Sequence, residues 1–309
     1  MEDDEPLRVV RIDLHSRLPN TRLFPDVNVY LLIDSGEALL VDAGYGFQSS
    51  TSRIMNAIKR YHAEVSGIVI THGHVDHFSS AGRLRRRLDC TVMAHGEDAS
   101  FIEEPASLLS SDPFFGHDAK TRALGYVALK LLAGLSPCTV DKRLKDGDEI
   151  RVGNAKLRVL HTPGHTKGHI CLYEPERGLL FTGDHVISAG LSWILPTRGD
   201  VKEYVQSLKR LLKLRISLIL PGHGRPLRNC RSVLLDRLAR VSSRERSILR
   251  LLRKGPMDED GLLKGLWYGG NPLNRLISRP VLRAYLKKLL DERRIAIIRA
   301  GNRTFYTLS

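Results

Sequence analysis

Three histidines and an aspartate lie within six residues of one another, in the segment Thr71-His-Gly-His-Val-Asp-His77. This segment directly follows the apolar run Gly67–Ile70, which the pattern predicts to be a short buried strand. Imidazole nitrogens and carboxylate oxygens are ligands that suit a borderline cation such as zinc. The chain must therefore fold so that a loop at the end of a strand is held rigidly enough to place several ligands at once.

The spacing within this segment divides the potential ligands into two pairs. Gly73 lets the backbone turn tightly, so His72 and His74 are expected to converge on one ion. Asp76 and His77 are then placed to reach a second ion nearby.

Three later segments repeat the same design, with a potential ligand next to a glycine after a predicted strand. They are Gly164-His165, Gly183-Asp184 and Gly222-His223-Gly224. Each alone is also compatible with an ordinary turn that carries a surface side chain. Loops held at strand ends by a rigid scaffold commonly carry functional groups, so the four segments together favour a shared site.

The first 230 residues alternate between strand-like and helix-like stretches. Helices are predicted where apolar residues recur at helical spacing, from Ile54 to Tyr61 and from Val201 to Leu212. Residues 97–140 have a mixed pattern and receive no assignment. The predicted strands are Val29–Ile33, Ala38–Val41, Gly67–Ile70, Thr91–Ala94, Lys156–Leu160, Ile170–Tyr173, Leu179–Thr182 and Ile216–Leu220.

Positive charge is concentrated at the C-terminal end of the chain. Residues 240–309 contain 16 Lys and Arg against 6 Asp and Glu, a net charge of +10, while the whole chain carries +14. This asymmetry indicates a module that binds a polyanion, and the alternatives are a solvated basic surface or a packing module. We therefore expect a catalytic domain over residues 1–235 and a small basic domain over residues 240–309.

The basic segment has the pattern of three helices followed by a two-stranded ribbon, which resembles a winged helix. Ser242 and Glu245 match a capping box at a helix start, and Pro280 suits the first turn of the last helix. The expected elements are a helix from Ser242 through Arg253, a short helical piece after Asp258, a helix from near Ser278, and strands over Ile295–Arg299 and Arg303–Leu308.

Composition argues against a secreted or membrane protein. The acidic start, Met-Glu-Asp-Asp-Glu-Pro, contains no apolar signal region, and no apolar run approaches the length of a membrane span. The four cysteines are scattered and are expected to be buried and reduced, as in a cytoplasmic protein. They are Cys90, Cys138, Cys171 and Cys230.

Over about residues 8–230 the chain resembles the metallo-β-lactamase-fold hydrolases, whose H-x-H-x-D-H motif matches His72–His77. The family's later single ligands match His165 in Thr-Pro-Gly-His-Thr, Asp184 in Thr-Gly-Asp-His and His223 in Pro-Gly-His-Gly. Asp42 matches an early aspartate that supports the site. The resemblance implies an α+β fold, an αββα sandwich with the site at one edge of two packed sheets, here followed by the small winged-helix domain.

The resemblance also implies how the ligands are shared. His72, His74 and His165 would hold one metal ion, Asp76, His77 and His223 the other, and Asp184 would bridge them. The expected cofactors are two divalent ions, Zn²⁺ by default with Mn²⁺ or Fe²⁺ as alternatives. Asp76 and Asp184 are the expected catalytic residues. The expected nucleophile is a hydroxide that bridges the two metal ions. His169 is expected to have a structural or supporting role. His185 is expected to pack in the interior, with contact to the substrate as the alternative.

Departures from other subgroups narrow the substrate. His74 stands where flavo-diiron members place a glutamate, and no cysteine occupies a ligand position. Only 38 residues separate Asp184 from His223, too few for the insertion of nucleic-acid-processing members. What remains resembles beta-lactamase-like protein 2, a family with a single-strand-specific endoribonuclease. Single-stranded RNA, bound through the basic domain, is therefore the expected substrate.

Two further readings stay open: a thioesterase of the hydroxyacylglutathione hydrolase type acting on a small thioester, and a non-enzymatic nucleic-acid-binding regulator. The oligomeric state is not predicted. The expected phosphate contacts are Arg283, Lys287, Arg294, Arg299 and Arg303, and the candidates for base stacking are Trp267, Tyr268, Phe305 and Tyr306.

Overall fold

The computed structural model describes residues 7–15, 25–106, 119–266 and 272–309. Two of the candidate stacking residues, Trp267 and Tyr268, lie outside the described residues.

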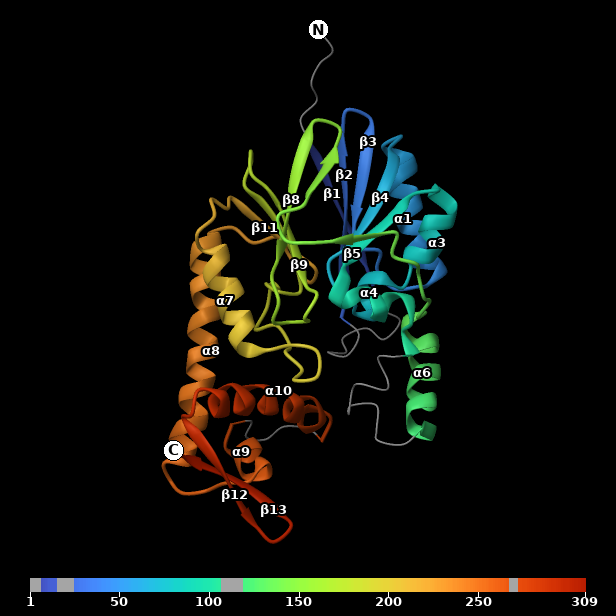
Figure 1. The fold of residues 1–309 in the computed structure, drawn as a ribbon. Coiled ribbons are helices and arrows are strands. Elements are labelled where there is room, and N and C mark those ends of the chain that lie inside the picture. The colour runs from blue at the N-terminus through green and yellow to red at the C-terminus, as the bar shows by residue number, and fades with distance from the viewer. Residues whose placement is uncertain (1–6, 16–24, 107–118, 267–271) are drawn as a thin grey trace.

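Two β-sheets pack against each other at the centre of the molecule (Figure 1). The first sheet has the strand order β1-β2-β3-β4-β5-β6, and the second has the order β11-β10-β9-β8-β7. The strands of the first sheet are β1 (Arg8–Leu14), β2 (Val27–Asp34), β3 (Glu37–Val41), β4 (Glu64–Ile70), β5 (Thr91–His95) and β6 (Lys142–Leu144). Those of the second sheet are β7 (Glu149–Val152), β8 (Ala155–His161), β9 (Ile170–Glu174), β10 (Leu179–Gly183) and β11 (Leu218–Pro221).

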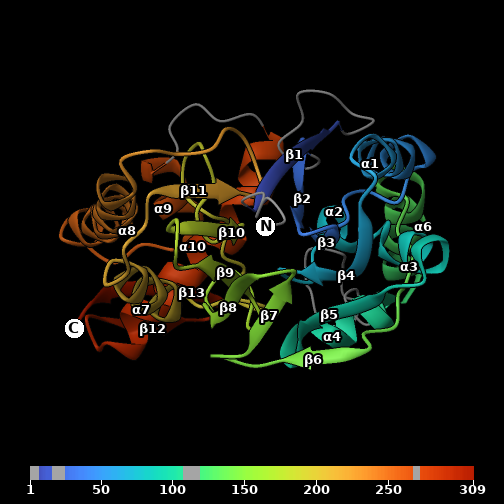
Figure 2. The ribbon, with the colours of Figure 1, turned by 90° about the horizontal axis from the view of Figure 1, so that it is seen from above.

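Helices cover the outer face of each sheet, and Figure 2 shows the resulting four layers from above. The first sheet is covered by α1 (Gln48–Arg60), α2 (Val75–Phe78), α3 (Ala81–Leu88), α4 (Gly96–Glu103) and α6 (Ala119–Ala133). The second sheet is covered by α7 (Val201–Leu211) and α8 (Cys230–Leu252). The expected αββα sandwich is confirmed.

Strand residues alternate between two hydrophobic layers, as the period of two in a β-strand requires. Leu31 of β2 packs in the layer between the first sheet and its helices, whereas its neighbour Leu32 packs between the two sheets. Phe181 of β10 reaches the same inter-sheet layer, where its ring centroid is 5.3 Å from that of Tyr30. Because both faces of these strands are buried, they are apolar throughout rather than alternating.

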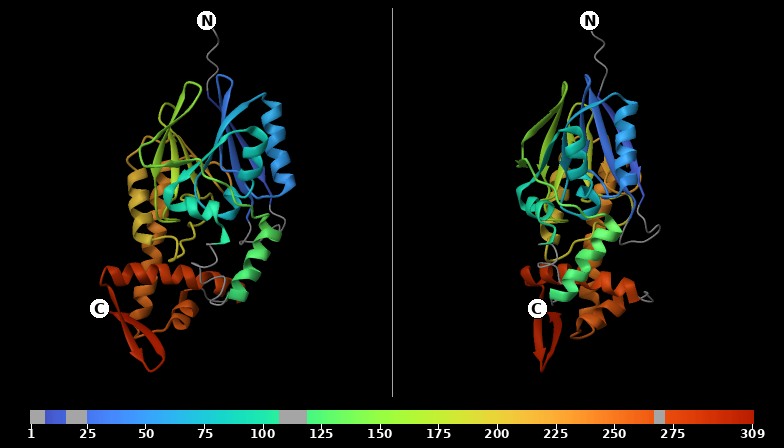
Figure 3. Two further views of the ribbon diagram at one scale, coloured as in Figure 1. Left: turned by 45° about the vertical axis from the view of Figure 1, so that its right-hand side comes forward. Right: turned by 90° about the vertical axis from the view of Figure 1, so that its right-hand side faces the viewer.

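The C-terminal region consists of α9 (Glu259–Leu266), α10 (Pro272–Asp291) and the two-stranded ribbon of β12 (Ile295–Ala300) and β13 (Arg303–Leu308). These elements pack below the second sheet and against the lower part of α8, in all views of Figures 1 and 3. The hydrophobic cluster on the outer face of the second sheet continues into this region, from Tyr204 of α7 through Ile248 of α8 to Leu289 of α10. The winged-helix assignment stays a prediction.

Two predicted helix starts in this region are wrong. The helix expected to begin at Ser242 is the second half of α8, which runs unbroken from Cys230. Glu245 does not close a capping box, because its carboxylate pairs with Lys288 Nζ at 2.7 Å and with Arg294 Nη1 at 3.2 Å. The helix expected near Ser278 begins at Pro272, so Pro280 lies inside α10.

The predicted division between residues 235 and 240 falls inside α8, and it stays a prediction about domains. A single helix and a shared hydrophobic cluster continue across that point.

Every helix among the described residues is too short or too polar to span a membrane. All four cysteines are buried and unpaired.

Candidate metal centre

The four ligand-bearing segments meet at the same edge of the two sheets, the lower edge in Figure 1. β3, β4 and β5 are parallel, so the loops after them leave the first sheet at one edge. β10 and β11 are also parallel, and Asp184 and His223 follow their carboxyl ends. His165 lies between β8 and β9 at that edge.

A first cluster brings together His72, His74, His165 and Asp184, whose potential ligand atoms all lie within 4.8 Å of one another. Nδ1 of His74 lies 3.0 Å from Nε2 of His72 and 2.9 Å from Nε2 of His165. The three rings face one another at right angles, with interplanar angles of 79–87°. Three ring nitrogens thus point at one small volume.

A second cluster brings together Asp76, His77 and His223 within the same limit of 4.8 Å. Nε2 of His77 lies 3.3 Å from Nε2 of His223, and Oδ2 of Asp76 also lies 3.3 Å from Nε2 of His223. Space for this approach depends on Gly222, because a Cβ there would lie 2.7 Å from Cε1 of His77.

The two carboxylate oxygens of Asp184 face different clusters. Oδ2 lies 3.8 Å from Nε2 of His165 in the first cluster. Oδ1 lies 3.2 Å from Nε2 of His223 and 3.4 Å from Nε2 of His77 in the second. All seven residues predicted as ligands are therefore brought together, and Asp184 sits between the two groups.

Asp42 fixes which nitrogen of His77 faces the site. Its Oδ2 lies 2.8 Å from Nδ1 of His77 and 3.0 Å from the hydroxyl of Thr71, which donates to it. The hydroxyl oxygen of Thr71 is 3.1 Å from Nδ1 of His72. Because these Nδ1 atoms are bonded to acceptors, the Nε2 lone pairs of His72 and His77 are left for the site. Asp42 therefore lies in the supporting position that the resemblance implied.

Backbone carbonyl groups orient two further histidines in the same way. Nδ1 of His223 donates to the carbonyl oxygen of Asp26 at 2.6 Å, and Nδ1 of His165 donates to that of Trp193 at 2.6 Å. The hydroxyl of Ser192 is also 2.8 Å from Nδ1 of His165. A carbonyl oxygen can only accept a hydrogen bond, so Nδ1 of both histidines carries a hydrogen and Nε2 is the nitrogen that faces the site.

The electrostatics of the two clusters differ. Burial and the neighbouring histidines hold the pKa of His72 and of His74 well below the usual value. Burial also lowers the pKa of His223, but Asp184 and Asp76 outweigh it and raise that pKa to about 10. The second cluster is thus rich in negative charge and favours a cation.

The geometry fits a metal ion at each cluster. A tetrahedral zinc ion, with bonds of about 2.0–2.1 Å, has ligand atoms roughly 3.3 Å apart. The nitrogen–nitrogen distances of 2.9, 3.0 and 3.3 Å in the two clusters are close to that spacing. Imidazole and carboxylate donors on a buried, preformed scaffold are the ligand set that zinc and similar divalent ions take.

Two other histidines lie behind the clusters. Nδ1 of His169 is 3.0 Å from the hydroxyl of Thr162, and its ring lies 5.3 Å from that of His72. His185 is fully buried with its ring 4.6 Å from that of Tyr204. The structure therefore favours packing over substrate contact for His185, because its side chain presents no surface to a ligand.

Asp98, which sequence reasoning missed, ties the two loops of the first cluster together. Its Oδ2 accepts from the backbone N–H of Gly73 at 2.8 Å and from the hydroxyl of Thr166 at 2.7 Å. Its Oδ1 accepts from the N–H of Gly168 at 3.0 Å. One buried carboxylate thus sets the distance between the loop of His72 and His74 and the loop of His165.

Arg198, which sequence reasoning also missed, holds the loop of His72 and His74 through a second contact. It is 5% exposed, and its Nη2 donates to the carbonyl oxygen of Gly73 at 3.1 Å. Its guanidinium carbon lies 4.3 Å from the ring centroid of Phe101. Neither Asp98 nor Arg198 belongs to a motif, so only their packing identifies them.

Comparisons with known proteins agree with this geometry. The family model of the metallo-beta-lactamase superfamily matches residues 23–223, a range that contains all seven clustered residues. A crystal structure of a metallo-beta-lactamase family protein from Thermus thermophilus is similar, with a TM-score of 0.76 and 25% identity over 97% of this chain and 98% of that one. A beta-lactamase domain protein from Burkholderia ambifaria shares the fold, with a TM-score of 0.81 and 21% identity over 97% and 91% of the two chains.

Three sequence relatives are similar at lower or partial coverage. An uncharacterized protein of Aquifex aeolicus is 34% identical over 203 residues, 64% of this chain and 84% of that protein. An atrochrysone carboxyl ACP thioesterase of Aspergillus fumigatus is 24% identical over 299 residues, 91% of this chain and 61% of that protein. A hydroxyacylglutathione hydrolase of Chelativorans sp. is 29% identical over 202 residues, 65% and 63% of the two. The chain spans less than two thirds of the length of the last two proteins.

Proposed function

Because this chain belongs to the metallo-beta-lactamase superfamily, we propose that it is a binuclear metal-dependent hydrolase whose substrates are thioesters. The observation that carries the binuclear part is the placement of Asp184, with one carboxylate oxygen toward each cluster. His72, His74 and His165 would hold one ion, Asp76, His77 and His223 the other, and Asp184 would serve both. When bound, two divalent ions at such a site supply an acidified water and polarise the scissile group.

The protein's own residues prepare the site before any substrate arrives. Asp42 and the carbonyl groups of Asp26 and Trp193 fix the ring orientations, so the ligand nitrogens need no rearrangement. Burial raises the pKa of Asp184, but His223 and His77 outweigh it and hold that pKa well below its usual range. Asp184 is therefore ionised at neutral pH, as a bridging role requires.

The thioester substrate is supported by two named relatives. The thioesterase of Aspergillus fumigatus is similar across 91% of this chain, which includes much of the C-terminal region. The segments Thr162–His169 and Phe181–Asp184 resemble the motifs of hydroxyacylglutathione hydrolases, and one such hydrolase is a relative. Thioesters therefore rank above RNA as the proposed substrate, whereas the sequence pattern favoured RNA.

Single-stranded RNA is the second candidate, and the net charge of +10 over residues 240–309 is the observation that favours it. Most of the cations expected to contact phosphate are, however, engaged within the protein. Their partners are Glu259 for Arg283 at 2.8 Å, Asp200 for Lys287 at 2.8 Å, Glu245 for Arg294 at 3.2 Å and Asp258 for Arg303 at 2.5 Å. Phosphate contact would have to replace these ion pairs, which weakens the case for RNA.

The test is turnover by metal-loaded protein of S-lactoylglutathione, acetyl-coenzyme A and a labelled single-stranded RNA. We expect thioester hydrolysis that His74→Ala abolishes, with the RNA left intact. His62→Asn is the matched control, since His62 is exposed, lies outside both clusters and has a φ of 49° that asparagine tolerates. If the protein instead cleaves RNA, loses this activity in His74→Ala and leaves the thioesters intact, RNA replaces thioesters as the proposed substrate. No hydrolysis of any substrate would contradict the proposal.

A further inference from the structure

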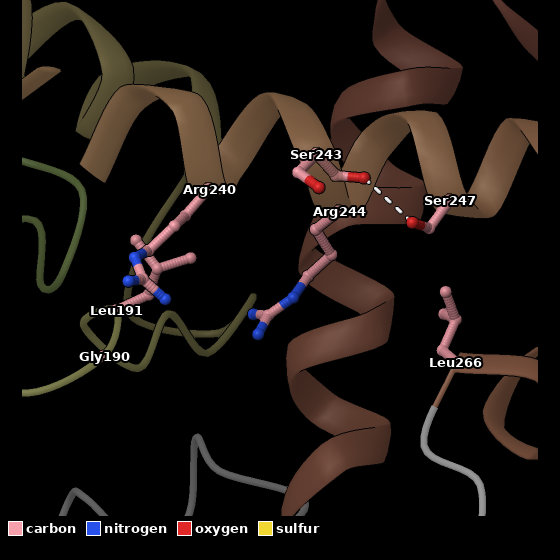
Figure 4. A pocket seen from close by; sticks show the side chains of 7 residues that line it. All are labelled: Gly190, Leu191, Arg240, Ser243, Arg244, Ser247 and Leu266. Carbon is pink, nitrogen blue, oxygen red and sulfur yellow. Dashed lines mark hydrogen bonds between the residues drawn. The ribbon is translucent and has the colours of Figure 1, made fainter. Parts of the chain in front are cut away.

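A cavity of about 320 Å³ lies between α8 and the loop that follows β10. Its α8 wall carries Arg240, Ser243, Arg244 and Ser247, and its loop wall carries Gly190 and Leu191. Figure 4 shows both guanidinium groups extending from α8 toward the loop. The volume is larger than one small anion needs and leaves room for the group attached to it.

The charged side chains that line this cavity are positive. Two arginines and no carboxylate are among the described residues that line it. Arg240 and Arg244 are four residues apart on one helix, a spacing at which like charges repel each other. Arg240 is partly compensated by Asp236, whose Oδ2 lies 2.7 Å from its Nε, although its side chain stays 55% exposed. A bound anion would offset the positive charge of the two guanidinium groups.

Contacts with neighbouring residues hold Arg244 and the serine beside it in place. The guanidinium carbon of Arg244 lies 5.3 Å from the ring centroid of Tyr285, which is buried and holds the arginine in place. The hydroxyl of Ser247 donates to the carbonyl oxygen of Ser243, whose own hydroxyl lies on the same wall. Guanidinium groups recognise oxyanions through parallel N–H donors. A tetrahedral phosphate offers enough oxygens for both arginines and a hydroxyl, whereas a planar carboxylate offers only two.

The cavity and the metal centre share a loop. Leu191, on the cavity wall, precedes Ser192 and Trp193, which both contact Nδ1 of His165. At the loop's start, Nη2 of Arg237 on α8 donates to the carbonyl oxygen of Ile187 at 3.1 Å. Asp184 and Gly190 are six residue steps apart, so their Cα atoms lie at most about 22 Å from each other. A substrate arm of about that length is therefore long enough to join the two places.

We propose that Arg240 and Arg244 bind a phosphate group carried at the far end of the thioester substrate. This inference rests on the proposed function, and it specifies the substrate as a phosphate-bearing thioester. A thioester whose arm ends in carboxylates, such as that of glutathione, would use the cavity less well.

The test compares S-acetyl-4′-phosphopantetheine with S-acetylpantetheine, which differ only in the phosphate. The wild-type protein is expected to show a KM about tenfold lower for the phosphorylated thioester. Arg240→Gln and Arg244→Gln should each raise that KM about tenfold and remove the preference. Arg246→Gln is the matched control, because Arg246 is exposed on the same helix and does not line the cavity. Equal KM values for the two thioesters in the wild type would overturn the proposal.

A binding measurement separates failure of this inference from failure of the proposed hydrolase. Calorimetric titration with 4′-phosphopantetheine, which contains no thioester, should show binding to the wild type that weakens about tenfold in Arg240→Gln. Binding with this pattern but no hydrolysis would retain the phosphate site and reject thioester turnover. Absence of binding to the wild type rejects the phosphate site whatever is hydrolysed. Arg244→Lys, which keeps the charge, replaces Arg244→Gln if the latter melts early.

Discussion

Asp98 shows how much of the site depends on a residue outside the ligand set. Its carboxylate accepts three hydrogen bonds from two separate loops, and its side chain is 1% exposed. A buried donor without a partner costs about 1–3 kcal/mol, and three donors would lose their partner together. The loops of the first cluster are then no longer held at a fixed separation.

We predict that Asp98→Ala lowers the free energy of unfolding by about 3 kcal/mol and weakens metal binding at the first cluster by about tenfold or more. Asp98→Asn keeps one acceptor oxygen and should lose less of both. Urea unfolding and metal titration measure the two quantities. Wild-type values for both in Asp98→Ala would show that the loops are held by other contacts.

The seven clustered residues were predictable from sequence because five of them stand beside a glycine after a predicted strand, and Asp76 and His77 complete the H-x-H-x-D-H motif. Their supports were not, because an isolated aspartate or arginine carries no such signal. Asp98 lies in the segment that the sequence left unassigned, and Ser192 and Arg198 lie in a loop without periodicity. Only the folded chain brings these three residues next to the ligand loops.

At the scale of elements, Asp200 joins the catalytic sandwich to the C-terminal region. Its Oδ1 caps α7 by accepting from the N–H groups of Lys202 at 2.7 Å and Glu203 at 3.2 Å. Its Oδ2 pairs with Nζ of Lys287 on α10 at 2.8 Å. One side chain therefore both starts a helix and attaches another to it.

We predict that Asp200→Ala lowers the free energy of unfolding by about 1–2 kcal/mol, since it removes both the cap and the ion pair. Asp200→Asn, which still caps, should lose less. Burial raises the pKa of Asp200, but the hydrogen bond from Lys287 and the N–H groups of α7 outweigh it and lower that pKa.

The lowered pKa gives this prediction a pH dependence. A carboxyl whose pKa is lower in the folded state contributes stability above its unfolded pKa, and loses it as the pH falls through the folded value. The difference between wild type and Asp200→Asn should therefore be full at pH 7 and shrink below about pH 4. Urea unfolding at pH 7 and pH 3 measures it, and an unchanged difference would exclude the ion pair as the cause.

Elements with strong apolar runs were predictable, and those without them were not. The predicted strands around Leu31, Ile68 and Phe181 are confirmed because both of their faces are buried. β6 has three residues and β7 has four, too few for a pattern to stand out. The start of α8 was misplaced because a local capping signal at Ser242 is overridden by packing along the whole helix.

At the scale of the whole molecule, the C-terminal region is part of the core. Val241, Ile248 and Leu252 of α8 are at most 2% exposed and belong to the same hydrophobic cluster as Tyr204 and Leu208 of α7. Each buried side chain of this size stabilises the fold by about 1.5–3 kcal/mol. Their joint loss is comparable to the whole stability of a typical domain, about 5–15 kcal/mol.

We therefore predict that deleting residues 240–309 prevents stable folding rather than leaving an active catalytic domain. Soluble yield and a cooperative thermal transition measure this against the full chain. A truncated protein that is soluble and melts cooperatively would contradict the prediction. It would show that residues 1–239 fold alone.

The central claim is a two-metal centre bridged by Asp184, and metal content per chain tests it most directly. Element analysis of the full-length protein, expressed with added metal and freed of loose ions, should find about two divalent ions per chain. Asp184→Ala should hold fewer than one, because both clusters lose a ligand, while His223→Ala should keep about one and His62→Asn about two. Only trace metal in the wild type, or two ions retained in Asp184→Ala, would contradict the account.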